Sequence, residues 1–155
     1  TISQPDDLEA RVQCQVAACL SISGVVNVRL GLSHAFGHQI GAYGNVAHGA
    51  TSCIMLPHVM RFVAPMAASQ MARMATAMGL DTGGMSDESA AAAAVDAVES
   101  LVRELGLPRR LRDVGVRQED LKAIAGASFP EAAGSNSPRP VSNPDEVLQL
   151  LQKAW

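Results

Sequence analysis

All four histidines of the chain lie in one stretch, which decides the fold: Gly31-Leu-Ser-His34-Ala-Phe-Gly-His38-Gln-Ile-Gly-Ala-Tyr-Gly-Asn45-Val-Ala-His48-Gly-Ala-Thr-Ser-Cys-Ile-Met-Leu-Pro-His58-Val-Met-Arg-Phe62. Histidine is the commonest protein ligand for transition metals, and its pKa lies closest to neutral pH. The concentration of all the histidines in one segment therefore indicates a functional site.

The spacing of these histidines limits the site. His34 and His38 are four residues apart, so on a helix they share one face. His34 and His48 would lie about 21 Å apart on one straight helix that rises about 1.5 Å per residue. A transition-metal ion needs each imidazole nitrogen at about 2 Å. For both residues to bind one ion, the chain must turn between them.

Residues suited to such a turn stand between the two histidines. Gly41, Gly44 and Asn45 tolerate left-handed backbone conformations, so the stretch predicts a helix, a turn and a second helix. A histidine on an apolar helix face is, however, more often a hydrogen-bonded core residue than a ligand. Two ligands also make an incomplete catalytic site, so spacing alone leaves metal binding and packing as alternatives.

The whole motif resembles a known signature. The run Gly-Leu-x-His-x-x-x-His-x-x-Gly-Ala-x-x-Asn-x-x-His-Gly, followed by Leu-Pro-His-Val-Met-Arg-Phe, is similar to that of the iron-containing (group III) alcohol dehydrogenases. The resemblance implies that His34 and His48 are ligands of Fe²⁺ or Zn²⁺. It places His38 between the metal and the nicotinamide, as a catalytic and cofactor-binding residue, and assigns His58 to packing.

The same resemblance implies that part of the enzyme is absent from this chain. The family's other two ligands, an aspartate and a histidine four residues after it, have no counterpart, and no glycine-rich pyrophosphate loop follows a strand. Residues 1–155 are therefore expected to be a helical, C-terminal metal-binding domain without its N-terminal nucleotide-binding domain. The complete enzyme would transfer a hydride between a small alcohol or aldehyde and NAD(P), and this chain alone would be inactive. The resemblance also allows a homodimer.

Two other interpretations stay open. A maleylacetate reductase-like enzyme is the first, although that branch departs from the Asn45-x-x-His48-Gly49 pattern. The second is a helical scaffold remnant that keeps the packing without the chemistry. Metal stoichiometry separates this scaffold from an enzyme.

Composition favours an all-α fold, a compact multi-helix domain. Apolar residues make up 48% of the chain but aromatic residues only 3%, which is typical of closely packed helices. The resemblance implies the dehydroquinate synthase-like helical domain of the family. A net charge of −3 argues against nucleic acid as a partner. We interpret the short basic run from Arg109 to Arg112 as a solvated surface, with a phosphate site as the alternative.

The cysteines and the hydropathy indicate a cytoplasmic protein. Cys14, Cys19 and Cys53 are odd in number and match no Cys-x-x-Cys motif, so we expect reduced thiols in the core. No apolar run is long enough to span a bilayer, so a membrane is not an expected partner.

Helix boundaries follow from caps and apolar spacing. A first helix should begin near Asp7 and bury one stripe, and a second should carry His34 and His38. Pro57 should end or kink the third, and Glu99 should pair with Arg103. The remaining expectations are the stripe Leu8, Val12, Val16 and Leu20, an apolar face from Val25 through Phe36, a helix from Met66 to Met78, one from Ser86 to Leu105 and one from Asn143 to Trp155.

Overall fold

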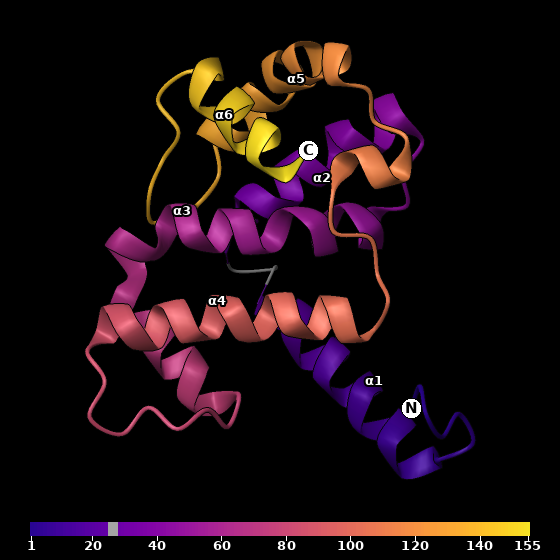
Figure 1. Ribbon diagram of the computed structural model, residues 1–155, viewed down its shortest axis with the longest axis vertical. Helices are drawn as coiled ribbons and strands as arrows, with labels where there is room; N and C mark the ends of the chain where they lie inside the picture. Colours follow the sequence, from indigo (N-terminus) through magenta and orange to yellow (C-terminus); the bar gives the residue numbers. More distant parts are fainter. Residues whose placement is uncertain (25–27) are drawn as a thin grey trace. The chain divides into compact units, whose positions relative to one another are not determined.

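The computed structural model describes residues 1–24 and 28–155, and every regular element within them is helical (Figure 1). The predicted all-α class is therefore confirmed. The elements are α1 (Leu8–Ser23), α2 (Leu32–Gly44), α3 (His48–Ala77), α4 (Asp87–Glu104), η2 (Leu111–Val114), η3 (Gln118–Asp120), α5 (Leu121–Ala133) and α6 (Pro144–Ala154). None of these helices is both long enough and apolar enough to cross a membrane.

The chain forms two compact units, and the first, Thr1–Leu30, contains α1. This helix begins where the sequence predicts, because the Asp7 carboxylate accepts a hydrogen bond of 3.0 Å from the Ala10 N–H. Its predicted buried stripe is wrong. No residue of α1 is buried, since the described residues of this unit include no second helix for it to pack against. Cys14 and Cys19 are likewise exposed rather than core thiols.

The second unit, Gly31–Trp155, begins with the predicted helix, turn and helix. α2 starts at Leu32, and Val28 before it is exposed, whereas Val25 lies outside the described residues. Asn45 makes the turn with a φ of 50° and a ψ of 39°, in the left-handed region. Gly41 and Gly44, which were expected to share that role, lie inside α2 instead.

α3 keeps helical backbone geometry through Pro57, so the expected end or kink at that residue is wrong, but its 30 residues form two helices that meet at a kink at Ala67. A proline costs a helix one backbone hydrogen bond and crowds the preceding turn. Here the residues around Pro57 are buried in the core, and that packing holds the helix together. The backbone leaves helical geometry only at Ala67, where φ is −132°, two residues after Pro65. Figure 1 shows the bend.

The second unit has two apolar clusters on either side of α3. The first joins α2 and the N-terminal half of α3 to α5 and α6, and its fully buried members include Phe36, Ile40, Met55, Ile124 and Leu151. The second joins the C-terminal half of α3 to α4, where the small residues Ala90, Ala91 and Ala94 are buried. Small side chains let the two helices approach closely, so α3 supports both clusters.

Polar contacts fix the ends and the mutual positions of the helices. Ser86 caps α4, and the Asn143 amide oxygen accepts a hydrogen bond of 3.0 Å from the Glu146 N–H at the start of α6, as predicted. Glu99 of α4 pairs with Arg61 of α3 through a contact of 2.7 Å. The expected ion pair of Glu99 with Arg103 within α4 is therefore replaced by an ion pair between helices, in which Arg61 of α3 binds the same carboxylate.

Candidate metal centre

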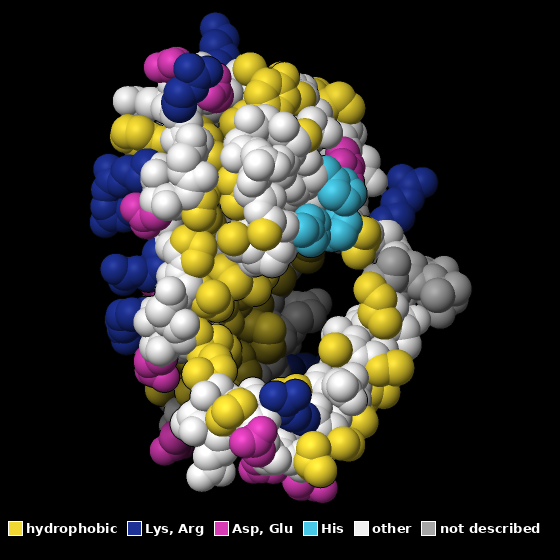
Figure 2. All heavy atoms as spheres, turned by 90° about the vertical axis from the view of Figure 1, so that its right-hand side faces the viewer, with side chains coloured by type: hydrophobic (Ala, Val, Ile, Leu, Met, Phe, Trp, Pro, Cys, Tyr) yellow, Lys and Arg dark blue, Asp and Glu magenta, His cyan; other side chains and the backbone are white. Residues whose placement is uncertain are grey.

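Three imidazole rings meet at the surface of the second unit. The centroids of the His34 and His38 rings are 4.4 Å apart, those of His34 and His48 are 4.8 Å apart, and those of His38 and His48 are 5.7 Å apart. Figure 2 shows histidine side chains gathered in one patch beside an acidic side chain. The fold therefore brings together the three histidines to which the family resemblance gave metal-binding or catalytic roles.

The backbone accounts for this convergence. His34 and His38 lie one turn apart on the same face of α2, and His48 is the first residue of α3. The left-handed turn at Asn45 reverses the chain between the two helices. The hydroxyl of Thr51, which is fully buried, donates a hydrogen bond of 2.8 Å to the His48 carbonyl and secures the first turn of α3.

Gly37 allows the close approach of these helices. A Cβ atom at this position would lie 3.0 Å from the His48 Cε1 atom and 3.0 Å from the Thr51 Oγ1 atom. Both distances are tighter than nine in ten real Cβ contacts, so a neighbouring atom would have to shift by a few tenths of an ångström. The absence of a side chain at Gly37 therefore gives the His48 ring and the Thr51 hydroxyl room to lie close to α2.

Glu131 of α5 holds the His38 ring. Its two carboxylate oxygens lie 2.9 Å and 3.1 Å from the His38 Nδ1 atom. An ionised carboxylate can only accept hydrogen bonds, so Nδ1 carries the proton and donates it. The lone pair of a neutral His38 then resides on Nε2. Sequence reasoning missed Glu131, because 93 residues separate it from His38 and no local spacing connects the two.

The electrostatic surroundings favour a neutral His34. Burial lowers the pKa of His34 below its ordinary value of 6.5, and the neighbouring His38 and His48 lower it further, against a smaller opposite effect of Glu131. Neutral imidazole is the form that binds metals. The donor chemistry of His34 therefore fits a transition-metal ion at neutral pH.

Within residues 1–24 and 28–155, no group of three or more His, Cys, Asp or Glu side chains is arranged to hold a metal ion. His58, the fourth histidine, lies ten residues after His48 on α3, where it is partly buried and lines a pocket that the other three histidines do not line.

The helical fold and the histidine motif both agree with one class of protein domain, the C-terminal helical domain of iron-containing alcohol dehydrogenases. Residues 1–155 match the family model described as Fe-containing alcohol dehydrogenase family, C-terminal. The chain belongs to this family.

Individual relatives agree with this assignment. The chain is 39% identical over 149 residues to lactaldehyde reductase of Escherichia coli K12 and 31% identical over 149 residues to 1,3-propanediol dehydrogenase of Citrobacter freundii. Each alignment covers 96% of this chain but only 39% and 38% of the respective relative. The structure of NADH-dependent butanol dehydrogenase A from Thermotoga maritima superposes with a TM-score of 0.81 at 25% identity, covering 99% of this chain and 41% of that protein. The chain thus spans about two fifths of the length of these relatives.

Proposed function

We propose that this chain is the helical, metal-binding part of an NAD(P)-dependent dehydrogenase that transfers a hydride reversibly between a small alcohol or aldehyde and the nicotinamide. The cluster of His34, His38 and His48 is the observation that carries the proposal. Family membership supports it, because the relatives named above are dehydrogenases and reductases of small alcohols and aldehydes.

In this proposal His34 and His48 are the metal ligands of the chain. Fe²⁺ is the expected ion, since the family is iron-containing, and Zn²⁺ is the alternative that also prefers imidazole nitrogen. When bound, the ion supplies Lewis acidity that stabilises negative charge on the substrate oxygen. An aspartate and a histidine on an earlier helix, outside residues 1–155, would complete the shell, and the cofactor domain is also outside them, so residues 1–155 alone are expected to be inactive.

His38 is the proposed catalytic and cofactor-contacting residue. Because its Nδ1 proton is donated to Glu131, its Nε2 atom is the nitrogen that can orient the substrate or accept and return its proton. Glu131 acts through His38 and is therefore a positioning residue, which fixes both the tautomer and the ring orientation.

Two proposals concern the rest of the molecule. A homodimer of the complete enzyme is one, based on the family resemblance alone. A cytoplasmic location is the other, and it is supported by three cysteines that are all free in this structure.

The two alternative functions are less favoured. Asn45 and His48 in the motif disfavour the maleylacetate reductase-like enzyme. The convergence of three imidazoles, which packing alone would not require, disfavours the scaffold.

The decisive experiment is the intact mass of the source protein in its native extract, followed by metal analysis of that species. A longer chain with about one iron or zinc ion supports the proposal. His34→Ala should remove most of the metal, whereas His58→Ala, a matched control outside the cluster, should retain it. A metal-free native protein, or turnover by residues 1–155 alone, would refute the assignment.

A further inference from the structure

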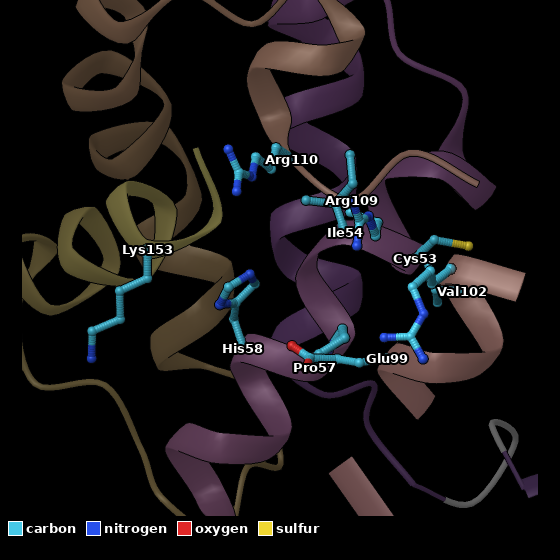
Figure 3. A pocket seen from close by; sticks show the side chains of 10 residues that line it. Cys53, Ile54, Pro57, His58, Glu99, Val102, Arg109, Arg110 and Lys153 are labelled. Atoms are coloured by element: carbon cyan, nitrogen blue, oxygen red, sulfur yellow. The ribbon is translucent and has the colours of Figure 1, made fainter. Parts of the chain in front are cut away.

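A pocket lies apart from the histidine cluster, among α3, α4, the segment after α4, and α6 (Figure 3). Its volume is about 290 Å³. His58 lines it, and at a rise of about 1.5 Å per residue it lies about 15 Å along α3 from His48. The full lining is Cys53, Ile54, Pro57, His58, Glu99, Val102, Arg103, Arg109, Arg110 and Lys153. The pocket is therefore separate from the proposed metal centre.

The lining of this pocket is strongly basic. Four of its side chains are cationic, namely Arg103, Arg109, Arg110 and Lys153. Glu99 is the lone carboxylate among the lining residues, and it is already paired with Arg61. The chain as a whole carries a net charge of −3. Positive charge is thus concentrated in this pocket, although the net charge of the whole chain is negative.

Among the described residues, three of these cations have no carboxylate partner. In the part of the chain that the structure describes, the ion pairs join Arg61 and Arg117 to acidic residues and His38 to Glu131, and none of them involves Arg109, Arg110 or Lys153. Like charges that converge on one pocket repel one another. A bound anion would relieve that repulsion.

The structure also distinguishes members of the basic run that the sequence treats alike. Arg112 stacks over the Trp155 ring, with its guanidinium carbon 5.4 Å from the ring centroid. Arg109 and Arg110 instead line the pocket, and in Figure 3 they lie near His58. In the same view His58 lies between Lys153 of α6 and the α4 side chains Glu99 and Val102. Four separate segments therefore contribute to one concave surface.

We propose that this pocket binds a small polyanion, a compact molecule with phosphate or carboxylate groups. The planar guanidinium group binds both kinds of oxyanion through paired hydrogen bonds. A volume of about 290 Å³ equals that of about ten water molecules, which suits a short phosphorylated or polycarboxylate metabolite rather than a nucleic acid strand. This inference stands independently of the proposed dehydrogenase function.

The test is calorimetric titration of the 155-residue chain at fixed ionic strength with pyrophosphate and, separately, with citrate. Saturable binding of either ligand supports the proposal, and the tighter of the two identifies phosphate or carboxylate as the preferred group. The double variant Arg109→Ala/Arg110→Ala should weaken binding about tenfold or more, because each charged hydrogen bond contributes substantially to affinity. Lys153→Ala should weaken it in the same direction.

The matched control is Arg73→Ala/Arg117→Ala, which removes the same charge from residues that do not line the pocket. It should bind the ligand within about twofold of the parent, since long-range effects are screened at physiological salt. Helical circular dichroism establishes that each variant is folded. The proposal is overturned if neither ligand binds saturably, or if the control loses as much affinity as the pocket variants.

Discussion

Gly37 offers the sharpest test of how the histidine cluster is built. In the variant Gly37→Ala, the new methyl group would lie 3.0 Å from both the His48 ring and the Thr51 hydroxyl, and one of them must move. Thr51 is fully buried and hydrogen-bonded to the His48 carbonyl, whereas the His48 side chain is exposed at the surface. We therefore expect the His48 ring to shift by a few tenths of an ångström.

The expected change in the free energy of unfolding of Gly37→Ala follows from two opposing effects. Alanine is a better helix former than glycine by about 1 kcal/mol, but overpacking of a filled site costs about 1–3 kcal/mol. The net expectation is a loss of about 1 kcal/mol in the free energy of unfolding, which for a chain of this length lowers Tm by about 3 °C.

The control for this experiment is Gly126→Ala in α5. Gly126 is exposed, and a Cβ atom there would have no neighbour within 4 Å. This variant should gain the helix propensity without the collision, and its Tm should rise by about 3 °C. The difference between the two variants isolates the cost of the collision.

The measurements are thermal unfolding followed by circular dichroism, and the NMR shifts of the His48 ring protons. If Gly37→Ala is stabilised as much as Gly126→Ala and the His48 shifts are unchanged, the close-packing argument is refuted. A loss of stability with a displaced His48 signal is the expected result.

Three further predictions test other features. Asn45→Val should lose about 1–2 kcal/mol in urea unfolding while Asn45→Gly stays near the parent, because a branched residue is strained at a φ of 50°. The hydrogen bonds from Arg61 lower the pKa of Glu99 below 4.5, so this pair stabilises the fold above that pH and the stabilisation is lost as the pH falls through the lowered pKa. With the Arg61 and Glu99 side chains 44% and 42% exposed, the effect should stay below about 1 kcal/mol, and the stability of Glu99→Gln should lack this pH dependence. Trp155→Phe removes the 3.0 Å hydrogen bond from the indole N–H to the Val116 carbonyl and should cost about 1 kcal/mol in chemical denaturation.

Local signals in the sequence predicted local structure. The caps at Asp7, Ser86 and Asn143 are where they were expected, because a cap depends on residues three or four positions away. The turn between His34 and His48 was predicted from the nearby glycines and Asn45, together with the condition that both histidines bind one ion.

Features that depend on distant partners could not be predicted. Nothing near Glu99 indicates that Arg61, 38 residues earlier, would outcompete Arg103 for its carboxylate. The continuity of α3 through Pro57 depends on burial against helices from elsewhere in the chain. The exposed apolar stripe of α1 is a failure of the same kind. Apolar spacing predicts which face of a helix can be buried, but not whether another element is present to cover that face.

The His38–Glu131 bond also bears on the order in which the site can assemble. His34, His38 and His48 lie on two consecutive helices joined by a short turn, so the chain entropy lost in bringing them together is small. Glu131 reaches His38 only by closing a loop of 93 residues, which requires α5 to be docked on α2. The cluster of three imidazoles thus depends only on local structure, whereas the contact of the Glu131 carboxylate with His38 depends on tertiary structure. Loosening of α5 would free His38 to reorient while His34 and His48 stayed together.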